Sequence, residues 1–513
     1  MKSQPSLRRL PLQLFLLGLF LVLATFGAQR TNAQDAAAKN EPKVEKKSTL
    51  SAEDEYELFK LLADTVDQIE RNYVKDISRR ELMEAAIRGM LSKLDQYSNY
   101  IPPTEMDGFK GSVESEFGGI GIQISIDKDK EILVVSPLLG TPAYRAGVLA
   151  GDKITEINGQ ATKNISIEEA VKRMKGKSGT EVTLKIVRGA DGKTETLHLK
   201  REVVRVETVM SDRRKDNDSW DYMLDHEKKI GYVRIISFGR HTTEELTKAI
   251  KELSEQKLRG LILDLRFNPG GLLTCAIEVS DLFVTDGRIV STSGRNVPER
   301  TVDAKKEGTY SGFPIAILVN RFSASASEIV SACLQDHKLA VVIGERTWGK
   351  GSVQNIVELE EGKSALKLTT AAYHRPNGKN IHRFEGATET DDWGVRPNDG
   401  YEIKLSDAEW TALMKIRRDR DILKKDNKLV DDAPPEKFVD RQLQKAREYL
   451  AIKLGDAPAT PPAEKKETEK KDADKQTAEK STTDNKDSDK KADDKKDEAK
   501  ETKKEEKPSE EKK

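Results

Sequence analysis

The sequence predicts a multidomain α/β protein with helical regions at both ends and a charged tail, and three observations carry this prediction. The chain has 513 residues, which is equivalent to several domains of about 150 residues and argues against a single compact core. Apolar strands alternate with helical segments between residues 230 and 355, as in parallel sheets that are covered on both faces. From residue 456 to residue 513 no side chain is more apolar than alanine, and Lys, Glu and Asp dominate.

The first 33 residues have the pattern of an export signal. Lys2, Arg8 and Arg9 precede an apolar run over residues 10–28, and Thr31-Asn32-Ala33 supplies the residues that a signal peptidase would read. A run of about 19 residues is also close to the minimum for a transmembrane helix, so an uncleaved membrane anchor is the alternative interpretation. In either case we expect an exported protein, in the periplasm or on the outer face of the cytoplasmic membrane.

Helices are expected on both sides of the central domains. After a polar linker over residues 34–51, residues 52–111 contain two amphipathic helices, because apolar positions recur there at helical spacing. These positions are Tyr56, Phe59, Leu62 and Val66 in the first helix, and Leu82, Ala86, Met90 and Leu94 in the second. Residues 406–455 are predicted to form a C-terminal helical region. Neither region carries recognisable chemistry, so we expect packing or a homodimer contact through these helices.

The composition excludes several classes of protein. Basic and acidic residues number 88 each, and the resulting net charge of zero argues against a nucleic-acid protein held by phosphate contacts. The two cysteines, Cys275 and Cys333, exclude a disulfide scaffold, and each lies in an apolar run that predicts a buried thiol. Residues 456–513 cannot bury enough apolar surface to fold, so we expect a disordered tail.

Residues 112–205 combine short alternating strands with glycine turns. The run Gly118-Gly119-Ile120-Gly121-Ile122 opens a strand, and an Ala-Gly-Val-X-X-Gly-Asp motif ends at Asp152. A helix over residues 167–174 and a strand over residues 181–187 follow. A glycine turn alone would also fit an ordinary hairpin, but the order and length of the whole segment resemble a PDZ domain of the permuted bacterial type.

The PDZ resemblance places a carboxylate-binding loop at Gly119, Ile120, Gly121 and Ile122. Successive backbone N–H groups, exposed because glycine has no side chain, can hold a terminal carboxylate while the peptide adds as a strand to the sheet edge. We therefore expect this domain to bind proteins or peptides through free, apolar C-termini.

Residues 206–405 are predicted to form an α/β core in which three loops carry candidate chemistry. Each loop follows an apolar strand, and these strands span residues 261–265, 315–319 and 340–343. The loops are Phe267-Asn268-Pro269-Gly270-Gly271, the serine cluster over residues 323–328, and the segment from Gly344 to Gln354. Because ligands in such cores sit at the carboxyl ends of the strands, we expect the three loops to converge on a site.

A serine acts as a nucleophile when a base removes its proton and hydrogen-bond donors stabilise the oxyanion. None of the six histidines lies in a recognisable triad setting, and Gly-X-Ser-X-Gly is absent. Lys350 lies between two glycines and is a candidate base, because desolvation lowers the pKa of a lysine. Local sequence also allows a structural interpretation, in which Ser325 and Glu328 form a helix capping box and Lys350 is a surface residue.

Four segments together resemble the C-terminal processing peptidases, also called tail-specific proteases. They are Gly231 to Ile235, Leu263 to Arg266, Ser323 to Ile329, and Gly344 to Gln354, and the likeness extends over about residues 52–405. The resemblance implies a crotonase-like or ClpP-like α/β core with an inserted PDZ domain. It also implies a serine endopeptidase that uses a Ser/Lys dyad.

The resemblance assigns roles to individual residues. The nucleophile of the family matches Ser325, its lysine base matches Lys350, and the glutamine that positions the lysine matches Gln354. The oxyanion donors would be the backbone N–H groups of Ala326, at a helix N-terminus, and of Gly270 or Gly271. Because Ser323 and Ser327 share the local chemistry of Ser325, the choice among the three serines rests on the resemblance.

Two hypotheses about function follow. The first, which we favour, is an exported serine endopeptidase that cleaves proteins near their C-termini and binds the substrate C-terminus with its PDZ domain. The alternative is a catalytically inactive PDZ scaffold that binds protein C-termini. No metal cluster is recognisable, and neither glycine run, at residues 118–121 and 349–351, continues as a phosphate-binding motif. We therefore expect no metal and no cofactor.

Overall fold

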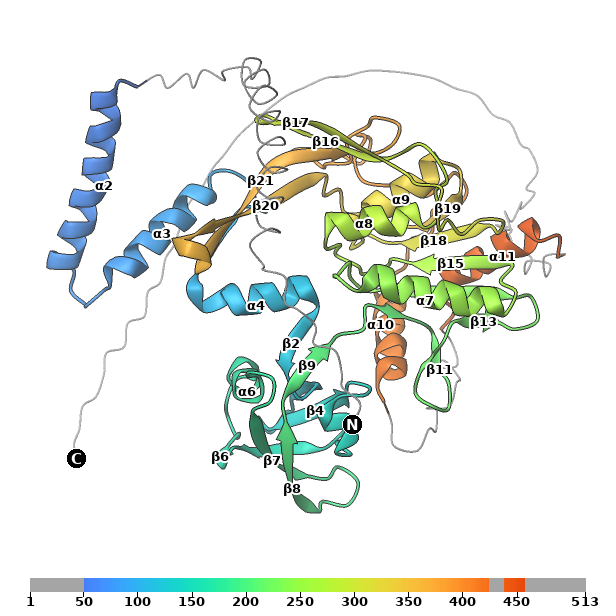
Figure 1. The fold of residues 1–513 in the computed structure, drawn as a ribbon, viewed down its shortest axis with the longest axis horizontal. Helices are drawn as coiled ribbons and strands as arrows, with labels where there is room; N and C mark the ends of the chain where they lie inside the picture. The colour runs from blue at the N-terminus through green and yellow to red at the C-terminus, as the bar shows by residue number, and fades with distance from the viewer. Residues whose placement is uncertain (1–49, 424–437, 457–513) are drawn as a thin grey trace, which may run out of the picture. The chain divides into compact units, whose positions relative to one another are not determined.

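The computed structural model describes residues 50–423 and 438–456 (Figure 1). The predicted export signal, the linker before residue 50 and the predicted disordered tail beyond residue 456 lie outside these residues. Over the described ranges, no helix combines the length and the apolar character needed to cross a membrane.

The N-terminal region contains the two helices that the periodicity predicts. Its elements are α2 (Ala52–Asn72), α3 (Arg79–Leu91), β1 (Asn99–Ile101) and α4 (Pro103–Glu114). The first two helices begin with reciprocal capping boxes, Ser51 with Asp54 and Ser78 with Glu81, which satisfy N–H groups of the first turn. Helix α4 begins at Pro103, a position where no backbone N–H is needed.

The PDZ region forms an antiparallel sheet in the order β3-β4-β5-β7-β8, with β6 paired to β5. Its elements are β2 (Glu116–Gly119), β3 (Ile122–Ile126), β4 (Ile132–Pro137), α5 (Pro142–Arg145), β5 (Lys153–Ile157), β6 (Gln160–Ala161), α6 (Ile167–Met174), β7 (Glu181–Val187), β8 (Thr194–Lys200) and β9 (Glu202–Arg205). Alternate residues of the strands, among them Ile132, Ile154 and Leu184, are fully buried against α6. Strands β2 and β9 pair with each other, so the chain enters and leaves this region side by side (Figure 1).

The core contains a parallel sheet in the order β14-β15-β18-β19, extended by the short antiparallel strands β10 and β13. Its elements are β10 (Val209–Met210), β11 (Arg213–Arg214), β12 (Trp220–Asp221), β13 (Met223–Asp225), β14 (Ile230–Ile235), α7 (Thr242–Glu255), β15 (Gly260–Asp264), α8 (Leu273–Asp281), β18 (Ile315–Val319), α9 (Ala326–Asp336) and β19 (Ala340–Gly344). Helices α7, α8 and α9 cover one face, while α11 (Arg441–Lys453) covers the other. This confirms the predicted sheet with two covered faces, and it explains why its strands are apolar throughout.

A second sheet has the order β1-β21-β16-β17, with β20 also paired to β21. It contains β16 (Arg288–Gly294), β17 (Val297–Asp303), β20 (Ser352–Leu359), the 3₁₀ turn η1 (Glu360–Gly362) and β21 (Ser364–His374). Strand β1 pairs antiparallel with β21, so that Asn99 lies opposite Lys367. The PDZ region is therefore inserted between two strands of one sheet, as predicted. The more specific likeness to crotonase and ClpP, and the domain boundaries, stay predictions.

Buried ionic contacts hold the C-terminal helices against the parallel sheet. Asp264, fully buried at the end of β15, accepts from Arg266 at 2.7 Å and also from Arg417 of α10 (Asp407–Asp421). Burial alone would raise the pKa of Asp264, but the two guanidinium groups hold it well below its usual range. Arg266 also donates to Asp440, the N-cap of α11, at 2.9 Å. Cys275 and Cys333 are buried free thiols, as predicted.

Candidate active site

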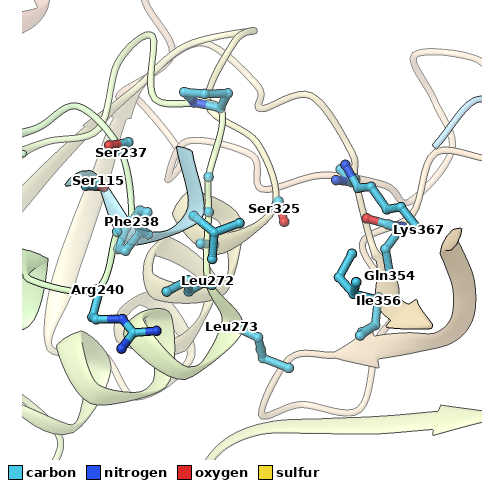
Figure 2. Close-up of a pocket in the computed structure, with 18 of the residues that line it drawn as sticks. Ser115, Ser237, Phe238, Arg240, Leu272, Leu273, Ser325, Gln354, Ile356 and Lys367 are labelled. Atoms are coloured by element: carbon cyan, nitrogen blue, oxygen red, sulfur yellow. The ribbon is translucent and has the colours of Figure 1, made fainter. Parts of the chain in front are cut away.

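The three predicted loops converge on one pocket with a volume of about 550 Å³ (Figure 2). The pocket lies where β15, β18 and β19 end, at the carboxyl edge of the parallel sheet. Every predicted catalytic and oxyanion residue lines it, namely Gly270, Gly271, Ser325, Ala326, Lys350 and Gln354. Convergence of a predicted nucleophile, a predicted base and backbone N–H groups in one apolar pocket is typical of an active site.

Of the three serines in the cluster, Ser325 is the one that lines the pocket. Ser323 is fully buried and donates to the carbonyl oxygen of Leu265 at 2.8 Å, while the buried Ser327 donates to that of Asn268 at 3.0 Å. Figure 2 shows the Ser325 side chain directed into the pocket, opposite Gln354 and Lys367. The fold thus gives different surroundings to three serines that local sequence cannot distinguish.

The backbone of Ser325 is strained. Its φ of 55° and ψ of −113° lie outside the regions that residues with a side chain normally occupy. Such conformations persist where the surrounding structure enforces them, and they cluster at functional sites. Here the Glu328 carboxylate accepts the Ser325 N–H at 2.8 Å and so helps to hold the turn that presents the hydroxyl to the pocket.

Gly270 and Gly271 bring a second backbone segment against the serine. A Cβ atom on Gly270 would lie 2.7 Å from Ser325 Cβ, and one on Gly271 would lie 2.1 Å from the Phe238 carbonyl oxygen, so both positions require glycine. The Gly270 N–H donates to Asn268 Oδ1 at 2.9 Å. Within the described residues, the N–H groups of Gly271 and Ala326 donate to no acceptor. Of the three predicted oxyanion donors, the N–H groups of Ala326 and Gly271 are therefore the two that remain available.

Lys350 enters the pocket from the loop after β19. Burial, together with the nearby positive charge of Lys367, lowers the pKa of Lys350 to about 8. Its Nζ lies 5.0 Å from the centroid of the Tyr97 ring, and in the described part of the chain it donates to neither Ser325 nor Gln354. The structure brings this lysine and the serine into one pocket without a direct hydrogen bond between them, a loose arrangement that is common before substrate binds.

Gln354 lies on β20, where the pairing with β21 shifts register between Val353 and Gln354. Its Nε2 donates to Ser352 Oγ at 2.8 Å and to Thr369 Oγ1 at 3.2 Å. The structure thus brings Gln354 to the predicted pocket. Its amide nitrogen is occupied by two hydroxyl groups of the second sheet.

Glu328 is a functional candidate that sequence reasoning missed. Its buried carboxylate accepts four hydrogen bonds: Oε1 from Thr347 Oγ1 at 2.5 Å and from the Gly349 N–H at 2.7 Å, and Oε2 from the Ser325 and Lys350 N–H groups at 2.8 Å each. Burial raises the pKa of Glu328, while the four donors act in the opposite direction. The capping-box pattern accounted for this glutamate locally and so concealed its contacts with the lysine loop.

The predicted carboxylate-binding loop lies between β2 and β3 in the PDZ region. Gly121 has a φ of 75°, and a Cβ atom there would lie 2.4 Å from the Thr141 side chain, so glycine is required. Ile120 is buried in the domain core. Strand β3, which begins at Ile122, lies at the edge of its sheet, where a peptide could add as a further strand.

Comparison with known proteins also indicates a protease. The chain is 38% identical over 386 residues to the carboxy-terminal-processing protease of Bartonella bacilliformis, a match that covers 73% of this chain and 85% of that protein. The chain belongs to the carboxy-terminal processing proteases. The family models for Peptidase family S41, the PDZ domain and the activating protease CtpB N-terminal domain match residues 229–392, 110–187 and 19–104 of the protease. It is a serine-type peptidase with a PDZ domain.

The protease is also similar to the carboxy-terminal processing protease CtpA of Bacillus subtilis, with 38% identity over 327 residues, covering 63% of this chain and 67% of that one. Among solved structures, the photosystem II D1 C-terminal processing protease is 29% identical, with a TM-score of 0.38, and the match covers 70% of this chain and 96% of that chain. Within its described residues the protease has no group of three His, Cys, Asp or Glu side chains arranged to hold a metal ion.

Proposed function

We propose that this protease cleaves exported proteins near their C-termini, with Ser325 as nucleophile and Lys350 as general base. The observation that supports this most strongly is the meeting of a strained, pocket-facing serine and a lysine of lowered pKa in one cavity. At pH 8 about half of the Lys350 side chains are neutral, compared with roughly 1 in 300 for an ordinary lysine. A catalytically silent scaffold would need neither feature.

In this mechanism, neutral Lys350 removes the proton from Ser325 Oγ while the oxygen attacks the scissile carbonyl carbon. The carbonyl oxygen gains negative charge and accepts from the N–H groups of Ala326 and Gly271. The C–N bond breaks as the lysine ammonium returns the proton to the leaving amine, and an acyl-enzyme ester remains on Ser325. Lys350 then deprotonates a water molecule, which hydrolyses the ester and regenerates the serine hydroxyl.

The residues that line the pocket favour a substrate with an apolar residue next to the cleaved bond. Phe238, Leu272, Ile329 and Ile356 contribute apolar side chains around Ser325. We propose that the PDZ domain binds the free C-terminus of the substrate at Gly119 to Ile122, which would direct the cut to the nearby part of the chain.

Mass spectrometry of a protein substrate incubated with the purified protease tests this proposal, because it reports cutting and position together. We expect cleavage by the wild type and nearly complete loss in both Ser325→Ala and Lys350→Ala, since dyad members act as a unit. Ser327→Ala is the matched control: its hydroxyl is buried away from the pocket, so activity should remain. Peptide binding without any cleavage by the wild type would favour the scaffold instead.

We further propose that the protease is exported through residues 10–28, as a cleaved signal or an anchor, and forms a homodimer. Helix α2 supports the dimer, because Tyr56, Phe59 and Leu61 are 67%, 73% and 62% exposed on it. A second copy of the chain would cover these side chains. Analytical ultracentrifugation should therefore give a dimer for the wild type and a monomer for Phe59→Asp.

A further inference from the structure

The segment between α3 and β1 contacts the second sheet close to the active site. The Asp95 carboxylate accepts the N–H groups of Tyr97 and Ser98 at 2.7 and 2.9 Å, and the Ser98 hydroxyl at 2.8 Å. It also accepts from Thr369 Oγ1, on β21, at 3.1 Å. The Thr369 N–H in turn donates to Ser98 Oγ at 3.1 Å. This segment, which precedes the PDZ domain, is thus joined to the core by side-chain hydrogen bonds.

The chemistry of these groups fixes the direction of each hydrogen bond. Burial acts to raise the pKa of Asp95, but the hydrogen bonds donated to it outweigh this effect and lower the pKa. The carboxylate is therefore ionised and can only accept, so the Thr369 hydroxyl must donate to it. The hydroxyl oxygen then has only lone pairs to offer to Gln354, 3.2 Å away, and Gln354 must present its NH₂ group.

This direction determines which end of the Gln354 amide is available to the active site. The NH₂ group is held by Thr369 and by Ser352. The carbonyl oxygen, Oε1, is left as a hydrogen-bond acceptor in the pocket that also contains Lys350 and Ser325. An acceptor there complements an ammonium group, whereas an inverted amide would present N–H groups to it.

We propose that Thr369 and Asp95 are positioning residues, which orient the Gln354 amide so that its oxygen accepts a hydrogen bond from the Lys350 ammonium. The inference rests on the proposed function. When Lys350 takes the proton from Ser325, Oε1 holds the resulting ammonium in place for transfer of that proton to the leaving amine. Loss of the Thr369 hydroxyl should therefore slow the chemical step and leave substrate binding unchanged.

Three single variants of the full-length protease test the chain of hydrogen bonds from Asp95 through Thr369 to Gln354. Thr369→Val removes the hydroxyl and keeps the shape and the backbone contact with Ser98, whereas Asp95→Ala would also break the turn at Tyr97. Thr369→Ser restores the hydroxyl. Thr370→Val is the matched control on the neighbouring residue, because Thr370 Oγ1 is buried and has no hydrogen-bond partner within the described residues.

The readouts are kcat and KM for one peptide substrate, together with the thermal unfolding temperature. For Thr369→Val we expect kcat to fall by about 10- to 100-fold, with KM within about twofold of wild type. Thr369→Ser should recover most of kcat, and Thr370→Val should match wild type. Wild-type kcat in Thr369→Val, a change confined to KM, or equal loss in Thr369→Ser would overturn the inference. Failure of the proposed function would give a different result. The wild type would then not cleave the peptide, or the Ser325→Ala variant would still cleave it.

Discussion

The backbone N–H groups of Ser325 and Lys350 donate to the same oxygen, Oε2 of Glu328, each at 2.8 Å. The proposed nucleophile and base lie on different loops, which are separated along the chain by α9 and β19. The buried carboxylate therefore fixes their relative position through the backbone, while both residues line the same pocket.

Glu328→Gln should lower kcat by about 10- to 100-fold, because a displacement of about 1 Å in a reacting group has an effect of this size. A glutamine has one acceptor oxygen, so its amide nitrogen must face one of the two donor pairs. These are the N–H groups of Ser325 and Lys350, and the Thr347 hydroxyl with the Gly349 N–H. The check is kcat for one peptide, with the thermal unfolding temperature measured in parallel. Glu385→Gln, which changes an exposed carboxylate in the same way, should behave as wild type. Equal kcat in both variants would contradict the role of Glu328.

Activity should increase with pH through about 8, because the neutral form of Lys350 is the proposed base and its pKa is lowered to about 8. At pH 7 about one tenth of the lysine is neutral, and the rate should level off about one unit above the pKa. Lys350→Arg should be inactive over the whole range, since a guanidinium stays protonated. The measurement is cleavage of one peptide from neutral to alkaline pH, and substantial activity of the arginine variant would rule out lysine as the base.

Lys367→Gln should move the acid limb of this pH profile upward by about 0.5 to 1 pH unit. Lys367 lines the same pocket, and its positive charge disfavours protonation of Lys350, while the negative charges of Glu328 and Asp95 act in the opposite direction. Removing the positive charge should therefore raise the pKa of Lys350. Lys363→Gln, at an exposed position beyond β20, serves as the control. An unshifted limb in Lys367→Gln would exclude this electrostatic effect.

A peptide with an apolar, free C-terminus should bind the PDZ domain at least about tenfold more tightly than its C-terminally amidated form, because charge-assisted hydrogen bonds to the loop are lost on amidation. Calorimetry with the Ser325→Ala protease measures binding without cleavage. Equal affinity for the two peptides would remove the carboxylate from recognition at Gly119 to Ile122.

Periodicity was sufficient to place many elements. The helix predicted over residues 167–174 and the strand over residues 181–187 coincide with α6 and β7. Ala170 and Met174 of the helix, at i,i+4 spacing, and alternate residues of the strand face one core. The hairpin of β16 and β17 went unpredicted. Its second strand is largely exposed and carries no apolar alternation.

The site was predictable only in part. Glycine turns and the order of strands located the three loops, but nothing local distinguishes Ser325 from Ser323 or Ser327; only their contacts in the folded core do. Glu328 accepts a hydrogen bond from Thr347, and Asp95 accepts one from Thr369. Each of these hydrogen bonds joins two separate segments of the chain, so no spacing motif could reveal them.

The pairing of β1 with β21 also has a consequence for the timing of synthesis. Asp95 and Thr369 are 274 positions apart, with the whole PDZ region between them. At 5–20 residues per second, the ribosome needs about 14 to 55 seconds to make the second partner after the first. A nascent chain that ends before β21 lacks Lys367 and Tyr373 of the candidate active-site pocket, even when its PDZ region is complete. Because β21 follows the PDZ region along the chain, we expect the nascent protease to have no peptidase activity until its core has been synthesised.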